Sequence, residues 1–362
     1  MAVATLLDVI RRNNQAVRFM HPLKNDNGNE QYIAANVLLR EAFRMARQCV
    51  TIQAAHPSNL SQEDPRSQSI LPSRKKRRQC GPQDMQDEWG NSSSSSITSQ
   101  SATHHQQSQP LPSFYQSLVC PSTEPLLNQD FMLGSTEGFF IYSRPLLLDD
   151  TGPLSTTLTD TTDNGSWEEL TAQQALVAAV TTFNMALLFH CRAISHLDGN
   201  ESTKVLLLSK TQKLYASVAQ LAAAVADMLD GTDAGYNDPT TRYAHTMEEL
   251  RVAAINNSQQ AFFAIEAIHQ PEHEESSSSH KLEENAANTA SYAQHCIELH
   301  LKRTSCQQDQ AGAVLSAYAF MERDEMEEIL TNALTLEVNA FSYRGTTGSN
   351  APRPRKPSAP AA

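Results

Sequence analysis

The chain has 362 residues, of which 40% are hydrophobic and only 6% aromatic, and its formal net charge is −12. Alanine is abundant while valine and isoleucine are sparse, a composition that favours helices over sheets. Basic side chains gather at residues 74–78 and in the tail, so the acidic remainder should not follow the phosphate backbone of a nucleic acid.

The six cysteines lie far apart with no paired spacing. The N-terminus lacks the charged region and apolar core of a signal peptide, and no apolar run approaches the length of a membrane span. These features predict an intracellular protein with reduced thiols, in the cytoplasm, the nucleus or both, without a membrane partner.

The first predicted element is a helical hairpin at residues 4–53. Leu6, Ile10 and Val17 recur at helical spacing in its first helix, and "HPLKNDNGNE" breaks the pattern with proline and an Asn-Gly turn. In the second helix, Ile33 and Val37 are expected on the apolar side with Leu38, Phe43 and Ala46. Residues 54–112 follow as a disordered insertion, because Ser, Gln, Pro and His offer no apolar face.

Residues 113–150 are predicted to be an extended strip, in which "GFFIYSRPLLLDD" is apolar and Pro145 forces an edge or a turn. A Thr- and Asp-rich linker at 151–166 connects this strip to the remaining helices.

Residues 167–343 are predicted to form an array of five helices. Ser166 and Glu169 form a capping box before the first helix, and Gly231 ends the second. The third helix begins after Asp238-Pro239 and runs to about residue 268. The fourth and fifth are expected at about 281–303 and 311–341, and residues 344–362 are a disordered tail.

A short motif recurs three times, as "NNQAV", "FNMAL" and "NNSQQ". Aligning the stretches brings three asparagines into register, with a small residue two positions later in the first two copies and Gln259 in the third. Each stretch lies within the first helix of a helical pair, and the second helix of that pair carries alanine and, in the later units, tyrosine. The predicted packing residues are Asn14, Ala16, Asn184, Ala186, Tyr215, Asn257 and Tyr292.

Close packing explains these residue types. Small side chains let neighbouring helices approach one another. A buried asparagine is costly unless it is paired, so a recurring asparagine implies a recurring partner. We expect Asn14 and Ala16 to face a neighbouring helix. The middle stretch has Phe183 where the others have Asn13 and Asn256, so the first asparagine of each doublet is interpreted as incidental.

The pattern resembles the tetratricopeptide-type (TPR-like) superfamily, whose first helices carry Asn-x-Ala or a similar small-residue pattern and whose second helices carry Ala and Tyr. The stretches "FIYSRPLLL", "VTTFNMALLFH", "KLYASVA" and "AAINNSQQAFF" are similar to a large uncharacterised microalgal family of TPR-like proteins. The resemblance implies an all-α fold of antiparallel helical hairpins, an α-solenoid. With the segments described above, the expected chain is such an array with a long disordered insertion and a short extended strip before its main part. The resemblance also implies partner binding, and it implies no particular activity.

The basic run "SRKKRR" lies in the insertion. Five consecutive cationic side chains are typical of nuclear import signals or of sites for acidic partners, and equally of a solvated linker. Both interpretations stay open for the run, which comprises Arg74, Lys75, Lys76, Arg77 and Arg78.

The chain carries no phosphate-binding loop, nucleophile elbow, zinc-protease motif or dinucleotide fingerprint, so no catalytic residue, cofactor or metal site is assigned. His190 and His196 miss the i, i+4 spacing needed for joint ligation. Cys296 and His300 have that spacing, but two ligands do not make a structural zinc site.

The sequence therefore predicts a non-enzymatic scaffold that binds a peptide or helix of another protein in a helical-repeat groove. The acidic body favours a basic partner segment, and the chain's own basic insertion or tail is one candidate, as an autoinhibitory self-contact. The alternative is a nuclear regulatory factor that uses the basic run for import or nucleic-acid contact. A third hypothesis is a helical enzyme with an unrecognised site.

Overall fold

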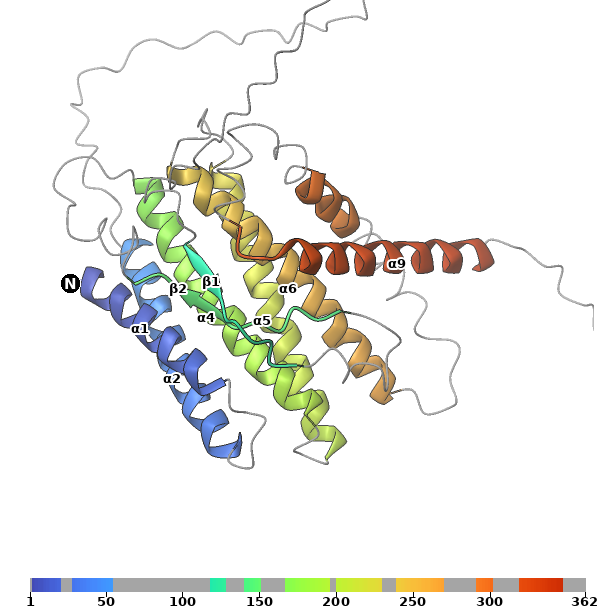
Figure 1. The fold of residues 1–362 in the computed structure, drawn as a ribbon, viewed down its shortest axis with the longest axis horizontal. Helices are drawn as coiled ribbons and strands as arrows, with labels where there is room; N and C mark the ends of the chain where they lie inside the picture. Colours follow the sequence, from blue (N-terminus) through green and yellow to red (C-terminus); the bar gives the residue numbers. More distant parts are fainter. Residues whose placement is uncertain are drawn as a thin grey trace, which may run out of the picture. The chain divides into compact units, whose positions relative to one another are not determined.

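The computed structural model describes residues 2–20, 28–54, 118–127, 140–150, 167–195, 200–229, 239–269, 291–301 and 319–347. These residues all belong to one compact unit, formed by residues 1–55 and 113–362. Within it, the predicted all-α character is confirmed, because nearly all of the long elements are helices packed against one another (Figure 1). The basic run 74–78, the rest of the insertion to 112, the linker 151–166 and the tail after 347 lie outside the described residues.

The N-terminal hairpin consists of α1 (Ala2–Met20) and α2 (Gly28–Ala54), which pack along each other. An ion pair between Arg12 and Glu41 links them. The predicted apolar face of α2 is partly correct: Ala46 is buried and Leu38 and Phe43 pack against the core. Ile33 and Val37, which are predicted on the same face, are exposed. The fully buried side is a row at helical spacing, made of Ala35, Leu39, Ala42 and Ala46. Three of these four residues are alanines, so α2 can approach its neighbours closely.

Three long helices form the centre of the unit: α4 (Trp167–Ile194), α5 (Glu201–Leu229) and α6 (Pro239–His269). Helix α5 packs on both α4 and α6, and α2 packs on the other side of α4. The Asn200 side chain accepts a hydrogen bond from the Ser202 N–H (2.9 Å) and so caps α5. The predicted start of the third helix at Pro239 agrees with the structure.

Helix α4 is apolar on nearly all sides. Residues 168–194 are long and apolar enough to cross a membrane, and the most apolar part of this segment is entirely buried inside the fold. The core helix of a soluble protein has the same properties, so this segment is weak evidence for a membrane span.

The last helix, α9 (Arg323–Thr347), begins well after the predicted residue 311. Phe320 and Met321 donate their backbone N–H groups to the buried carboxylate of Glu249 on α6 (2.8 and 3.2 Å). The Glu322 N–H donates to the Glu325 side chain (2.9 Å). Because these amides are held by side chains, the α-helix starts only at Arg323. A further helix occupies residues 291–301.

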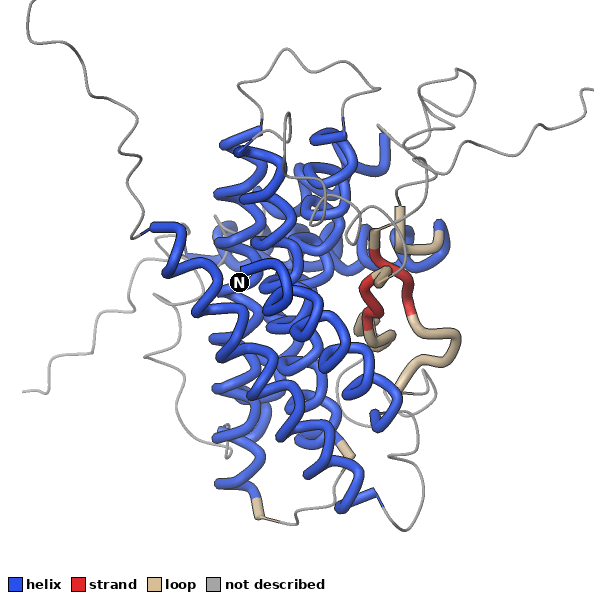
Figure 2. The backbone as a smooth tube through the Cα atoms, turned by 90° about the vertical axis from the view of Figure 1, so that its left-hand side faces the viewer, coloured by secondary structure: helices blue, strands red, loops and turns tan. Residues whose placement is uncertain are grey.

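The extended part forms a two-stranded antiparallel sheet of β1 (Val119–Pro121) and β2 (Leu146–Leu148), in which Cys120 pairs with Leu147. Strand β2 is the end of a longer extended segment, residues 140–148, which we call the strip. The strip lies along one side of the helices (Figure 2). It contacts helices that are far apart in the chain, from α1 and α4 to α6 and α9.

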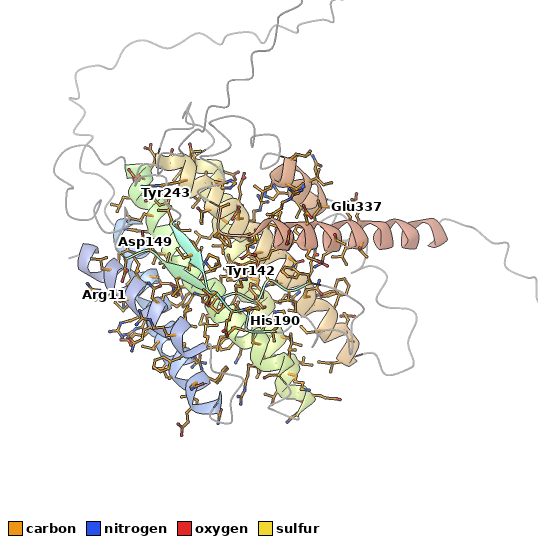
Figure 3. All side chains as sticks on the ribbon, viewed as in Figure 1. Arg11, Tyr142, Asp149, His190, Tyr243 and Glu337 are labelled. Atoms are coloured by element: carbon orange, nitrogen blue, oxygen red, sulfur yellow. The ribbon has the colours of Figure 1, made fainter. Side chains whose placement is uncertain are left out.

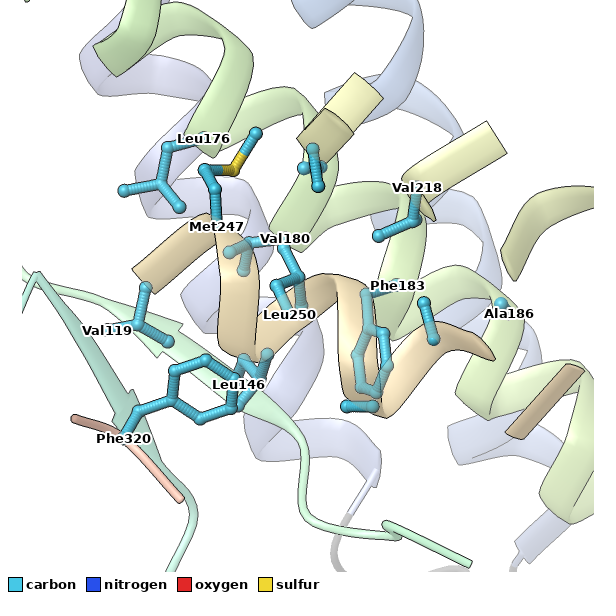
Figure 4. Packing of buried hydrophobic residues seen from close by; sticks show 14 of the residues in the cluster. Val119, Leu146, Leu176, Val180, Phe183, Ala186, Val218, Met247, Leu250 and Phe320 are labelled. Atoms are coloured by element: carbon cyan, nitrogen blue, oxygen red, sulfur yellow. The ribbon is translucent and has the colours of Figure 1, made fainter. Parts of the chain in front are cut away.

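A single hydrophobic cluster joins the hairpin, the strip and the central helices. Leu146 of the strip and Phe183 of α4 are fully buried in it, and Phe320 closes it from the α9 side (Figure 4). Tyr142 packs edge-on against both Phe183 and Phe320, with ring centroids 6.0 Å apart in each case. The strip is therefore part of the core, and at roughly 2 kcal/mol for each fully buried large side chain it contributes substantially to stability.

Candidate functional site

Four asparagines from four helices hold the backbone of the strip. Each accepts a hydrogen bond from the N–H of one strip residue through Oδ1 and donates one to the C=O of the same residue through Nδ2. The donor–acceptor distances lie between 2.7 and 3.2 Å. The pairs are Asn14 with Leu148, Asn184 with Leu146, Asn257 with Tyr142 and Asn332 with Phe140. We call this set the asparagine ladder.

Asparagine suits this role because its amide presents one acceptor and two donors, which match the N–H and C=O of a peptide group. In an extended chain, the N–H and C=O of one residue point to the same edge, and alternate residues share that edge. The ladder therefore reads residues 140, 142, 146 and 148, all on one edge of the strip. These contacts recognise main chain and carry no side-chain information.

Two further asparagines bridge the ladder. Asn13 donates to the Leu146 carbonyl (3.1 Å) and accepts from Asn184 Nδ2 (3.0 Å). Asn256 donates to the Phe140 carbonyl (3.0 Å) and accepts from Asn332 Nδ2 (2.8 Å). The interpretation of these two residues as incidental is wrong, because both side chains are completely buried and bonded to the strip.

The six asparagines form two equivalent triads. The first is the Asn13-Asn14 doublet of α1 with Asn184 of α4. The second is the Asn256-Asn257 doublet of α6 with Asn332 of α9. In each doublet the first asparagine also donates to the second, at 3.3 Å in α1 and 3.2 Å in α6. Each triad clamps two alternate strip residues, so the same recognition unit occurs twice.

The opposite edge of the strip is held by β1 and the residues that follow it. Ser122 N–H donates to the Pro145 carbonyl (2.8 Å), and Leu126 N–H donates to the Ser143 carbonyl (2.9 Å). The strip is thus bonded on both edges, by side chains on one and by main chain on the other.

Arg144 occupies the one even-numbered position between 140 and 148 where no described asparagine clamps the backbone. Its Nη1 lies 2.7 Å from Glu322 Oε1 and its Nε lies 2.9 Å from Glu325 Oε1. Burial raises the pKa of Glu325, and the Arg144 charge opposes that rise. The centre of the strip is therefore held by ion pairs to the Arg144 side chain, and the two flanks are held by hydrogen bonds to their backbone.

The other predicted packing residues support the ladder from behind. Ala16 and Ala186, two positions after a ladder asparagine, are completely buried. The Tyr215 hydroxyl accepts a hydrogen bond from Asn257 Nδ2 (3.2 Å). Tyr292 is buried in the 291–301 helix. The amide of Asn14 faces the strip and not a neighbouring helix, which differs from the expectation.

Asn332 was not among the predicted residues. In "TNALTL" an alanine directly follows Asn332, whereas in "NNQAV" and "FNMAL" the alanine comes two positions after the asparagine. Asn332 therefore did not fall into register with the recurring motif, although it lies within the predicted fifth helix.

No group of three or more metal-binding side chains occurs among the described residues. His190 lies in the core of α4 against Tyr215, and neither ring nitrogen has a hydrogen-bond partner there (Figure 3). Burial lowers the pKa of His190 from about 6.5 to about 4, so the ring is neutral at physiological pH. The arrangement that the described residues form most clearly is one that holds extended main chain.

No protein-family model, curated protein or solved structure matches this chain.

Proposed function

We propose that this chain is a non-enzymatic protein-interaction scaffold whose helices hold an extended peptide segment by its backbone. The observation that supports this proposal is the asparagine ladder. It supplies a donor and an acceptor to each of four residues on one strand edge, from four separate helices. We propose further that the helices form a TPR-like array, because a repeated Asn-and-Ala motif on successive helices produces a repeated contact to one continuous ligand.

The strip shows the chemistry of the ligand, because it is the segment that the ladder holds in this structure. Side-chain amides that pair with main chain would accept another segment of the same backbone geometry. Partner identity then depends on the side chains at the even-numbered positions, of which Tyr142, Leu146 and Leu148 are almost completely buried. The partner is accordingly a protein segment in extended form.

The test uses the full chain with residues 140–148 replaced by alternating glycine and serine, which we call the strip-replaced variant. A fluorescently labelled peptide of residues 138–150 is titrated against it, with anisotropy as the readout. We expect saturable binding with a Kd in the micromolar range and a rise in the unfolding temperature on binding. A peptide that fails to bind even at about millimolar concentration contradicts the proposal.

Backbone recognition is tested with two N-methylated peptides. Methylation of the Leu146 nitrogen removes the N–H that Asn184 accepts at 2.9 Å, and should weaken binding at least about tenfold. Methylation of the Ile141 nitrogen is the matched control, because no described residue accepts that N–H. Equal losses from both modifications would contradict ladder recognition.

The basic run Arg74–Arg78 lies outside the described residues, so the alternative of a nuclear regulatory factor stays a prediction. Localisation of a tagged chain with and without Lys75–Arg78 tests it directly.

A further inference from the structure

The ladder by itself does not fix which strip residue occupies which asparagine. Every clamp binds an N–H and a C=O, which all residues except proline possess in the same form. A shift of the strip by two residues keeps the same edge facing the asparagines and the same face facing the helices. A backbone ladder therefore needs a separate feature to set the register.

The two carboxylates that contact Arg144 supply that feature. Glu322 precedes α9 and Glu325 lies in its first turn, and both carboxylates contact the guanidinium. The Arg144 and Glu325 side chains are 21% and 11% exposed, so this pair is largely shielded from water, whereas the Glu322 side chain is 60% exposed. At the burial of Glu325 an unpaired carboxylate is costly, and one whose partner is removed destabilises the site strongly.

A third carboxylate adds to the negative charge at this place. Glu249 of α6 is completely buried and holds the backbone of residues 320 and 321. The charges of Glu325 and Glu249 both raise the pKa of Tyr142, after burial as the largest cause, while the Arg144 charge lowers it. Glu249 of α6, Glu322 before α9 and Glu325 of α9 thus bring three carboxylates near the centre of the strip, and Arg144 of the strip provides the cation.

We infer that Glu322 and Glu325 form a specificity site that selects an arginine at the centre of the bound segment and thereby sets its register. This inference rests on the proposed function and names the ligand class. The ligand is an extended segment with one arginine, an aromatic residue two positions before it and an aliphatic residue two positions after it. Tyr142, Arg144 and Leu146 are the chain's own example.

Arginine fits this site better than lysine. Two different nitrogens, Nε and Nη1, each contact one carboxylate, and a guanidinium holds them in a fixed planar arrangement. A lysine ammonium is a single point charge and cannot keep both contacts with the same geometry. A shift of the strip by two residues would place Tyr142 or Leu146 opposite the carboxylates and Arg144 in an apolar position. Both the guanidinium and the carboxylates would then lose their ion-pair partners.

The experiment titrates four peptides of residues 138–150, with Arg, Lys, Gln or Glu at position 144, against the strip-replaced variant. A fifth peptide exchanges Tyr142 and Arg144, so that its composition and net charge equal those of the natural peptide. We expect the Arg peptide to bind about tenfold more tightly than the Gln peptide and the exchanged peptide, with Lys in between and Glu weakest.

The same titrations are repeated on a strip-replaced variant that also carries Glu322→Gln and Glu325→Gln. Glutamine keeps an oxygen that can accept the Glu322 N–H, so the cap of α9 is preserved. The preference for Arg over Gln should fall to less than about twofold there. Equal affinity of the Arg, Gln and exchanged peptides for the first variant overturns the inference while leaving the proposed function in place. Failure of all five peptides to bind overturns both.

A second measurement applies if the strip-replaced variant does not fold. Arg144→Gln, the Glu322→Gln/Glu325→Gln pair and their combination are compared in the otherwise unaltered chain by urea unfolding. We expect the combined variant to be no less stable than Arg144→Gln alone, because removing the cation leaves the carboxylates unpaired. Additive losses overturn the inference.

Discussion

Loss of the ladder residue Asn184 should be costly. The residue is completely buried and makes three hydrogen bonds: it accepts from Leu146 N–H (2.9 Å) and donates to the Leu146 carbonyl (2.7 Å) and to Asn13 Oδ1 (3.0 Å). In Asn184→Ala, the Leu146 carbonyl keeps its bond from Asn13. The Leu146 N–H and the Asn13 oxygen both lose their partner.

The magnitude follows from those two atoms. A buried polar group left without a partner costs about 1–3 kcal/mol, so Asn184→Ala should lower the free energy of unfolding by about 2–6 kcal/mol. That is a large part of the stability of an ordinary domain. Urea unfolding followed by circular dichroism measures it. Thr181→Val on the same helix is the control, because Thr181 donates only to the carbonyl of Val177 one turn earlier. Its loss should stay near 1 kcal/mol.

Asn184→Asp separates a bidentate clamp from a buried polar residue of any kind. A carboxylate can accept from Leu146 N–H, but it has nothing to donate to the Leu146 carbonyl or to Asn13. Burial beside two acceptors raises the folded-state pKa of the new acid above its unfolded value of about 3.9. The folded state then binds the proton more tightly, so the deficit against the wild-type chain shrinks as pH falls from 7 toward 4.

The Asn184→Ala deficit should not change over that range. The reasoning is refuted if Asn184→Ala lies within 1 kcal/mol of the wild-type chain, or if the Asp deficit is independent of pH.

Three further predictions concern the core. Burial lowers the folded-state pKa of His190 to about 4, so the neutral ring contributes stability above pH 6.5 that is lost as pH falls toward 4. The free energy of unfolding, measured with urea, should fall by roughly 3 kcal/mol over that range. This fall should be absent in His190→Leu. Tyr215→Phe should lower the free energy of unfolding by about 1 kcal/mol, because Asn257 loses one hydrogen bond, and a neutral result contradicts that bond. A maleimide should label exposed Cys120 in the folded chain and buried Cys191, whose pKa burial raises to about 12, only after unfolding, as seen by mass spectrometry.

Helix existence was predictable because local signals agree with the tertiary structure. Pro239 marks the start of α6, and the apolar spacing of α1 matches its buried face. The face of α2 was predictable only in part, because its buried row is mostly alanine while the larger Ile33 and Val37 are exposed. Size alone misleads where close approach favours small residues.

The ladder was only partly predictable for a related reason. Sequence alignment groups Asn184 with Asn14, because alanine follows two positions later in both, and places Asn257 in register with them although Gln259 stands at that later position. The hydrogen bonds instead group Asn184 with Asn332. Asn184 accepts the N–H of Leu146, whose carbonyl also accepts a bond from Asn13. Asn332 accepts the N–H of Phe140, whose carbonyl also accepts a bond from Asn256. The equivalence of Asn184 and Asn332 comes from the two-residue period of the strip. The spacing of residues along a helix has a different period and does not reveal it.

Because the strip is covalently part of the chain, it should compete with an external peptide for the asparagine ladder. A segment joined to its own groove competes at an effective concentration on the order of millimolar. A free peptide of residues 138–150 that binds the strip-replaced variant with a micromolar Kd should therefore bind the wild-type chain about a thousandfold more weakly. Anisotropy titrations of both chains with the same labelled peptide measure this ratio. Tyr142→Asp in the wild-type chain should recover part of the lost affinity, since a buried carboxylate weakens the tethered strip and leaves the asparagines unchanged. Equal affinity of the two chains would mean that the peptide binds away from the ladder.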